Sequence, residues 1–303
     1  MSSTTVTSPP AAPRHGVVRR VSASLFRHPR ARLGLLATPP MLWLVVAYLA
    51  ALVALLITAF YTTDSLTGHM IRQPTLVNFQ TILHEPFYRT LTLRTVSVAV
   101  GVTVIDALLA IPFGLFLSKV VSRRWQGVLV VAMLVPLWAS YLVKAYAWRT
   151  LFENGGVLDW MFRPFGMHTP GFGLSAVVIV ECYLWFPYMV VAVFAGYERL
   201  PDSLLEASSD LGAKGWRTFR SVALPMVFPA IVAGSVFTFS LTLGDYIAVS
   251  LVGGQIQFLG NVIYSDVAGS ANQPLGAALS MIPITLVLLY LFVIRRSGAL
   301  SEL

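Results

Sequence analysis

The sequence predicts an all-α integral membrane protein with six transmembrane helices and both termini in the cytoplasm. Three observations indicate this fold class: the composition, the long apolar blocks, and the distribution of Lys and Arg. Of the 303 residues, 56% are hydrophobic and 11% are charged, and the mean hydropathy is +0.75. A soluble domain carries about 25% charged residues. The composition therefore disfavours a soluble enzyme, a disordered protein and a secreted disulfide scaffold.

Six apolar blocks are long enough to cross a membrane, which takes about 20 residues for a hydrocarbon layer of roughly 30 Å. The blocks are 34–61, 91–117, 127–152, 174–197, 223–251 and 276–294. They are apolar on all sides, unlike amphipathic surface helices. The alternating segments of about ten residues that are typical of an outer-membrane barrel are absent from the sequence.

The positions of the basic residues predict the orientation. If both termini are cytoplasmic, the inner segments hold most of the Lys and Arg, and the outer segment 252–275 holds none. The inner residues are Arg14, Arg19, Arg20, Arg27, Arg30 and Arg32 in the N-terminal tail, Lys119, Arg123 and Arg124 in the first inner loop, Arg199, Lys214, Arg217 and Arg220 in the second, and Arg295 and Arg296 at the end. This asymmetry favours the N-in, C-in topology. The net charge of +8 is thus explained by membrane orientation, and we expect no nucleic-acid partner.

Three segments follow from this pattern. Residues 1–32, rich in Ser, Thr, Pro and Arg, form a predicted disordered cytoplasmic tail. Residues 33–295 form the transmembrane domain, and 296–303 a short cytoplasmic C-terminus. The single cysteine, Cys182, excludes an intrachain disulfide, and we interpret it as a packing residue.

The inner loop 198–225 carries the most informative pattern. Pro201 suits the first turn of a helix, and Asp202 is favourable at its positive end. One face of this helix, at the spacing i, i+3, i+4, i+7, consists of Leu204, Ala207, Ser208 and Leu211. Gly212 stands where a glycine ends a helix. The loop is therefore predicted to project a short helix with a small-residue face, which either caps the bundle or meets another surface.

The residues of this loop match a known motif. They are Glu206, Ala207 and Ser208, then Gly212, then Val222, Ala223, Leu224 and Pro225. This order resembles the EAA loop of ABC importer permeases, with Ser208 in place of the third small residue and Val222 in place of Ile. The resemblance implies the type I importer permease fold. It also implies that Glu206, Ala207, Ser208, Gly212, Leu224 and Pro225 dock onto an ATPase subunit and transmit its motion.

Further stretches resemble permeases of the spermidine/putrescine type, and most closely the first of the two permeases of such importers. They are residues 136–148, 154–156, 243–246, 253–254 and 274–278. The resemblance implies a bacterial inner-membrane permease that takes up polyamines from an extracytoplasmic binding protein. It implies as partners ABC ATPase subunits, a second permease and the lipid bilayer. Opine, thiamine, phosphonate and ferric-ion permeases share much of this scaffold and remain alternatives.

Ionisable and aromatic groups inside the blocks are the candidate substrate pathway. A charged group in the hydrocarbon costs at least about 2.5 kcal/mol and normally faces the bundle interior. Carboxylates and aromatic faces suit a chain of ammonium groups. The candidates are Asp245, Tyr246, Trp138, Tyr141, Asp106 and Glu181. Trp138, Tyr141 and Trp148 are predicted to lie near one helical face. Each residue also has a structural explanation, such as a paired or protonated carboxyl, and Lys144 counts against an entirely anionic pathway.

The sequence holds no nucleotide-binding G-x-x-x-x-G-K-[ST] loop, and its histidines lie outside the blocks without metal-ligand spacing. We therefore predict no catalytic residues, no metal and no cofactor, with ATP bound by the partner ATPase. A stand-alone secondary transporter and, last, a membrane-embedded enzyme are the competing hypotheses. Dependence of transport on ATP and on partner chains distinguishes them.

Overall fold

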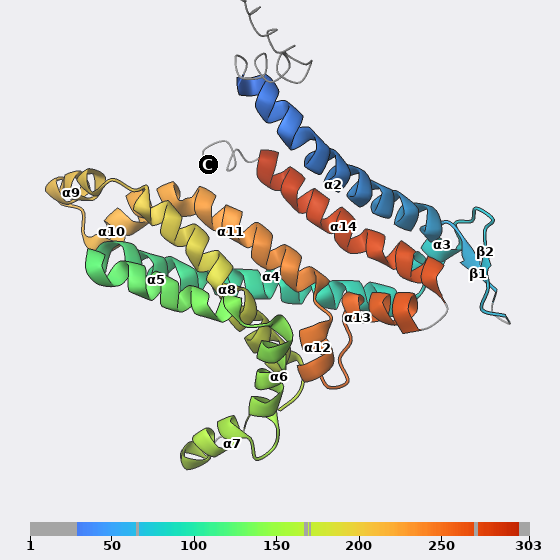
Figure 1. Cartoon of the computed structure of the whole chain (residues 1–303). Helices are drawn as coiled ribbons and strands as arrows, with labels where there is room; N and C mark the ends of the chain where they lie inside the picture. The colour runs from blue at the N-terminus through green and yellow to red at the C-terminus, as the bar shows by residue number, and fades with distance from the viewer. Residues whose placement is uncertain (1–28, 65–66, 167–168, 170, 270–271, 297–303) are drawn as a thin grey trace, which may run out of the picture. The chain divides into compact units, whose positions relative to one another are not determined.

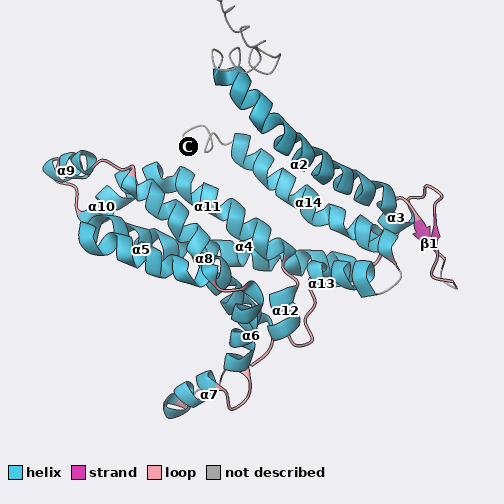
Figure 2. Cartoon of the chain, viewed as in Figure 1, coloured by secondary structure: helices cyan, strands magenta, loops and turns pink. Residues whose placement is uncertain are grey.

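The computed structural model describes residues 29–64, 67–166, 169, 171–269 and 272–296. Figure 1 shows that these residues are mostly helical, and Figure 2 marks the short hairpin β1–β2, which is the one sheet in the described part of the chain. The predicted helical class is confirmed. The chain divides into two units, Met1–Leu55 and Leu56–Leu303.

Helix α2 (Pro29–Ala59) forms the described part of the first unit and ends in the second. Its segment Ala37–Ala59 has a mean hydropathy of 2.6, as the first apolar block predicts. Residues 29–32 of the predicted tail are therefore helical, which corrects that boundary; the helix begins at Pro29, and a proline suits a first helical turn. The remainder of the predicted tail, 1–28, and of the C-terminus, 297–303, lies outside the described residues.

Three helices form the core of the second unit. They are α4 (Pro86–Leu115), α8 (Leu174–Glu198) and α11 (Leu224–Gly244). All three pack against one another, and glycines bring their backbones close together. A Cβ added at Gly196 of α8 would lie 2.6 Å from the Ala230 side chain of α11, and one at Gly114 of α4 would lie 2.9 Å from Val193. Such small residues are how membrane helices achieve close contact.

The third apolar block does not form one straight helix, which corrects the prediction for 127–152. It forms α5 (Arg123–Trp138) and α6 (Tyr141–Phe152), bent by 90° at Ala139 and Ser140. Ala139 is extended, with ψ of 141°, and Ser140 is likewise not helical, with ψ of 136°. Pro136 weakens the last turn of α5, and beyond the bend α6 packs against α8 and the short helix α12 (Ile247–Val252).

The fifth block is also divided, since α11 ends at Gly244 and α12 is separate. Two of the core helices are extended by π-helical turns: η1 follows α4, and η3 precedes α11. Such turns often mark functional sites. The other elements are β1 (Thr62–Thr63), β2 (Met70–Ile71), α3 (Val77–His84), η1 (Phe116–Val120), α7 (Val157–Phe162), η2 (Arg163–Phe165), α9 (Asp202–Asp210), α10 (Gly215–Thr218), η3 (Phe219–Ala223), α13 (Leu259–Tyr264), η4 (Ser265–Gly269) and α14 (Gln273–Arg296). Strands β1 and β2 are antiparallel, with Thr62 opposite Ile71.

Five described helices are long and apolar enough to span a membrane, and a sixth span results if α5 and α6 count as one. Two core clusters lie along α8. In the first core cluster, the half of α8 near Leu174 packs against α6 and α12. This cluster includes Val180, Leu184, Phe152 and Val249. In the second core cluster, the other half of α8 packs against α4, η1 and α11. This cluster includes Leu117, Tyr197, Leu200 and Val227.

Candidate functional site

Residues from three helices meet beside the first core cluster. We call Tyr141 of α6, Glu181 and Trp185 of α8, and Asp245 after α11 the carboxyl cluster. Figure 1 shows α6, α8 and α12 converging in this region. The bend between α5 and α6 places Tyr141 at the start of α6, and the end of α11 at Gly244 places Asp245 opposite it. Broken helices are thus what form the cluster, and membrane proteins keep such breaks where neighbouring groups satisfy the backbone.

Asp245 is buried, with 7% of its surface exposed, and both of its oxygens are used. Oδ1 accepts hydrogen bonds from the backbone N–H groups of Ile247 (2.8 Å) and Ala248 (3.1 Å), so it caps the start of α12. Oδ2 accepts a hydrogen bond from the Tyr141 hydroxyl. Asp245 therefore joins α11, α12 and α6 through one carboxyl group.

Glu181 is fully buried. Its Oε2 accepts a hydrogen bond of 2.6 Å from the indole Nε1 of Trp185, whereas Oε1 has no hydrogen-bond partner among the described residues. The carboxyl group lies close enough to Asp245 for the two to interact electrostatically. The Trp185 ring stacks on Tyr141 with centroids 5.9 Å apart. Trp185 was not predicted, although its position four residues after Glu181 places the two side chains on one helical face.

Asp106 of α4 is also fully buried, and neither of its oxygens has a hydrogen-bond partner of good geometry in the described part of the chain. Its carboxyl group lies beside the Cys182 thiol of α8. Cys182 is half-buried and packs against the first core cluster, in agreement with its interpretation as a packing residue. The structure thus places Asp106 against the helix that carries Glu181.

No cation balances these carboxyl groups within the residues that the structure describes, where the ion pairs all involve other side chains. A buried charge without a partner is strongly unfavourable. The three acids are therefore either protonated or placed to meet a positive charge from outside the chain. No group of three metal-ligating side chains occurs in the described ranges.

Two predicted pathway residues lie outside the carboxyl cluster. Trp138 ends α5, before the bend, and is 92% exposed, so the single face expected for Trp138, Tyr141 and Trp148 is wrong. Trp148 does pack with Tyr141 against the first core cluster. Tyr246 stacks on Tyr264 of α13, with centroids 4.5 Å apart, and its carbonyl accepts hydrogen bonds from Ser250 and Asn261. Through these contacts Tyr246 joins α12 and α13.

The predicted loop helix is α9, and it ends as the sequence indicates. Gly212 follows its last turn with φ of +78°, and its N–H donates to the Ser209 carbonyl at 2.8 Å. This left-handed conformation is the one that glycine adopts without strain. Pro201 precedes the helix rather than starting it, a shift of one residue that lies within the usual variation of helix boundaries.

The face predicted for α9 is largely uncovered within the chain. Leu211 is 89% exposed and Leu204 is 41% exposed, and Ala207 is exposed as well. Ser208 instead turns toward α10, where its hydroxyl lies 3.0 Å from that of Thr218. Glu206 is exposed. After the loop, Leu224 begins α11 and packs against the second core cluster, with Pro225 in the first turn of the helix.

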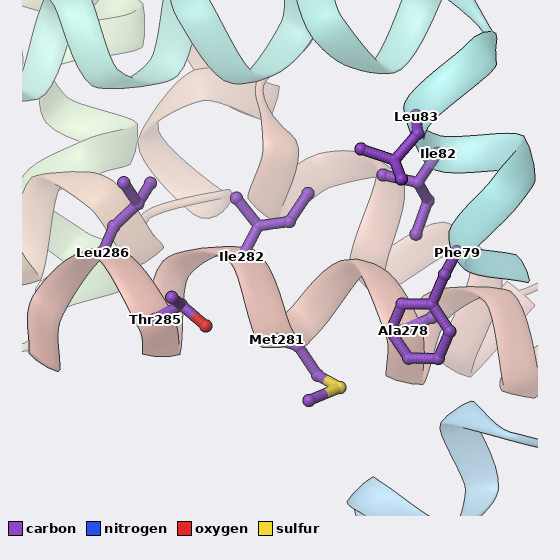
Figure 3. Close-up of a pocket in the computed structure, with 8 residues that line it drawn as sticks. All are labelled: Phe79, Ile82, Leu83, Ala278, Met281, Ile282, Thr285 and Leu286. Atoms are coloured by element: carbon purple, nitrogen blue, oxygen red, sulfur yellow. The ribbon is translucent and has the colours of Figure 1, made fainter. Parts of the chain in front are cut away.

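A separate apolar groove of about 370 Å³ lies between α3 and α14. Figure 3 shows its lining side chains reaching from both helices, with the Thr285 hydroxyl as a polar group among them. The groove contains none of the predicted site residues, and its chemistry is that of a helix-packing surface.

Comparison with known proteins shows the family. The family model described as "Binding-protein-dependent transport system inner membrane component" matches residues 106–298. The inner membrane ABC transporter permease protein YdcU of Escherichia coli K12 is 39% identical over 299 residues, covering 94% of this chain and 95% of YdcU. The spermidine/putrescine transport system permease protein PotB of the same organism is 30% identical over 264 residues, covering 85% of this chain and 94% of PotB.

The fold is similar to that of a solved structure. A chain of a bacterial alginate ABC transporter, in complex with an alginate pentasaccharide-bound periplasmic protein, matches with a TM-score of 0.69 at 14% identity. The match covers 92% of this chain and 97% of that one. The apolar helices, the fold and the matching family model agree. The chain belongs to the family of binding-protein-dependent transport system inner membrane components, and it is a multi-pass permease subunit of a bacterial ABC importer.

Proposed function

We propose that this permease imports polyamines, and that the carboxyl cluster and Asp106 line the path of the substrate. The observation that carries the proposal is the set of buried acids without a cation. Asp106 and Glu181 have unpartnered oxygens, and Asp245 lies beside Glu181. A polyamine carries several ammonium groups at neutral pH, each of which can replace the missing cation. The named substrates of the PotB relative support this class.

The aromatic rings of the cluster suit the same ligand. Tyr141 and Trp185 lie directly beside the two carboxyl groups. A cation over such a ring gains roughly 0.5–2 kcal/mol, the more so when it has lost water. Lys144 of α6 opposes a cation, and none of the ion pairs among the described residues neutralises its charge. In this proposal the acids outweigh it, because they lie deeper in the protein.

The proposed topology is N-in, C-in with six spans, in which α5 and α6 form the third span. Lys and Arg then gather on the cytoplasmic side, where α9 docks onto an ATPase subunit through Glu206 and the exposed face with Leu204 and Leu211. ATP is bound by that partner, since this chain has no phosphate-binding loop. A second permease and an extracytoplasmic binding protein complete the importer.

Asp245→Asn tests the proposed role of the carboxyl cluster in the substrate path. Asparagine keeps one oxygen to cap α12 and loses the charge, so assembly should persist. We expect about tenfold weaker uptake of spermidine and putrescine, because the variant loses one charge-assisted contact with the substrate that is worth roughly 1.5 kcal/mol. The measurement is uptake of the labelled polyamines by cells that produce the whole importer, with the amount of assembled complex determined in parallel.

Glu153→Gln is the matched control, because it removes an exposed carboxyl group whose ion pair with Arg149 is long, at 4.0 Å. It should leave uptake unchanged. Normal polyamine uptake by Asp245→Asn and by Glu181→Gln would refute the role of the carboxyl cluster in the path. Absence of polyamine uptake by the unmodified importer would refute the substrate assignment, while the membership in the importer family would stand in both cases.

A further inference from the structure

Helix α9 is held to the rest of the chain by few contacts. None of its residues is buried. Leu205 is half-buried and packs against the second core cluster, and the Ser208 hydroxyl contacts Thr218 of α10. Because apolar packing contributes so little here, polar contacts at the corner between α8 and α9 have a large share in fixing the orientation of the helix.

A set of polar contacts joins this corner to η1 and to the first turn of α5. We call it the polar latch, and it consists of Lys119, Arg123 and Gln126 as donors and Glu198, the Leu200 carbonyl and Asp202 as acceptors. Lys119 Nζ donates to the Leu200 carbonyl at 2.9 Å and to Asp202 Oδ1 at 2.6 Å. Glu198 accepts from Gln126 Nε2 at 2.7 Å and from Arg123 Nη1 at 3.3 Å.

The contacts of the latch differ in strength. The side chain of Arg123 is 87% exposed and that of Asp202 is 74% exposed, so their ion pairs are weakened by solvent. The Lys119 side chain is only 18% exposed, and Leu200, whose carbonyl it binds, is 2% exposed. Hydrogen bonds that involve a charged group and are shielded from water are the strong ones. The latch therefore has two strong contacts: the Lys119 to Leu200 bond, and the bond from Gln126, which is 6% exposed, to Glu198. Of these two, only the Lys119 bond lies beyond the end of α8, where it reaches the start of α9.

The position of Lys119 suits both of its acceptors. The Leu200 carbonyl follows the last turn of α8, where unpaired carbonyls and the negative end of the helix dipole favour a cation. Asp202 is in the first turn of α9, where a negative side chain is favoured. One ammonium group, with three donors, thus connects the end of one helix to the start of the next.

The latch also connects the loop to the proposed substrate path. Lys119 lies in the π-helical turn η1, which continues α4. Asp106 is on the same helix, about 20 Å away at the helical rise of 1.5 Å per residue. Glu198 is the last residue of α8, which carries Glu181, and Leu200 follows two residues later. A displacement of α9 that is transmitted through Lys119 therefore reaches both helices that hold the unpartnered acids.

We infer that Lys119 is a positioning residue for coupling: it fixes the start of α9 to the ends of α4 and α8, so that the three move together when the ATPase moves α9. The inference rests on the proposed docking of α9. It assigns a specific task to a residue outside the loop motif itself.

The experiment measures the distance between α9 and η1 in the assembled importer. Spin labels replace Ser209 and Val120, both exposed, in a background in which Cys182, the single native cysteine, is changed to alanine. We expect a narrow distance distribution that stays the same with and without ATP in the otherwise wild-type complex. With Lys119→Met the distribution should broaden, and spermidine uptake per ATP hydrolysed should fall about tenfold, because a charged hydrogen bond is lost.

Two variants show that the effect belongs to this contact. Lys119→Arg retains a charged donor and should restore the narrow distribution. Arg124→Met removes the same charge from an exposed position five residues away, where no ion pair or hydrogen bond is present among the described residues, and should behave as wild type. If Lys119→Met does not assemble, Lys119→Gln, which keeps a donor but no charge, takes its place in the comparison.

The outcomes separate this inference from the proposed function. If Glu206→Lys uncouples ATP hydrolysis from uptake, while Lys119→Met keeps the narrow distribution and normal uptake per ATP, the role of Lys119 is refuted alone. If Glu206→Lys also has no effect, the docking of α9 is refuted and the role of Lys119 falls with it. Broadening by Arg124→Met as well would show a general charge effect and would likewise overturn the role of Lys119.

Discussion

Asp245 combines a structural and a proposed functional task in one carboxyl group. One oxygen caps α12, and the other accepts from Tyr141. Replacement by alanine would remove both the cap and the charge, and a loss of uptake would then have two explanations. The isosteric asparagine separates them, which is why it is the informative substitution at this position.

The surroundings of Asp202 lower its pKa, and this predicts how the stability of the folded protein depends on pH. The hydrogen bond and charge of Lys119, followed by the charge of Arg123, hold the pKa of Asp202 below its ordinary value of 3.8. A carboxyl group whose pKa is lower in the folded than in the unfolded protein stabilises the folded state at any pH above its unfolded pKa. This stabilisation is lost as the pH falls through its pKa in the folded state. The contribution of Asp202 should therefore be constant from neutral pH to about pH 4.

Thermal unfolding of the purified permease and of Asp202→Asn checks this prediction. The variant should unfold at a slightly lower temperature at pH 7, with a difference that disappears only below about pH 4. The difference is small because Asp202 is exposed. A difference that disappears between pH 7 and pH 5 would identify another titrating group and contradict the assignment to Asp202.

At the scale of the element, the end of α9 depends on one backbone conformation. Gly212 has φ of +78°, and nothing within 4 Å would obstruct a side chain, so the constraint is conformational and not steric. Gly212→Pro cannot adopt this φ and lacks the N–H that bonds to Ser209, at a cost of about 3 kcal/mol. We expect it to disorder the end of α9 and to reduce both copurification of the ATPase and uptake.

Gly212→Asn is the control for this prediction, because asparagine tolerates the left-handed conformation. It should retain most of the copurified ATPase. Equal loss in both variants would show that the glycine itself contacts the partner, and normal copurification with proline would remove the end of α9 from the docking surface.

The bend between α5 and α6 shows where prediction of elements from sequence is weak. Residues 127–152 are apolar throughout, and periodicity alone does not distinguish one long helix from two. Pro136 is compatible with a kink, but the turn occurs after Trp138. Contacts that are distant in sequence, above all Tyr141 with Asp245, stabilise the bent form. The predicted alignment of Trp138 with Tyr141 was wrong for this reason.

At the scale of the whole molecule, the orientation of the chain is the property to test. The N-in, C-in proposal places Ser209 of α9 in the cytoplasm and Arg72, between β2 and α3, outside. In a Cys182→Ala background, a membrane-impermeant thiol reagent should label Arg72→Cys in intact cells. It should label Ser209→Cys only after the cells are opened.

Labelling of Ser209→Cys in intact cells would contradict the topology, and with it the docking of α9 onto a cytoplasmic ATPase. The positive charges around the loop favour the cytoplasmic location, since Lys and Arg close to the ends of spans are retained on that side. Both labelled positions are exposed in the structure, so the comparison does not depend on unequal burial.

The amino-acid sequence by itself determined the features that depend on local composition and spacing. The apolar blocks specify membrane helices, because about 20 apolar residues match the hydrocarbon thickness. The order from Pro201 to Gly212 specifies a short helix with a defined end, because proline and glycine act on the backbone next to them. These properties need no knowledge of which residues meet in space.

Only the tertiary structure decided which polar groups meet. Glu181 and Trp185 are related by one helical turn, but the approach of Asp245 and Tyr141 depends on two helix breaks that packing stabilises. Lys119 and Leu200 are separated by 81 positions and meet because α4 and α8 pack side by side. Contacts of this kind arise from the close packing of whole helices, and no local pattern in the sequence contains them.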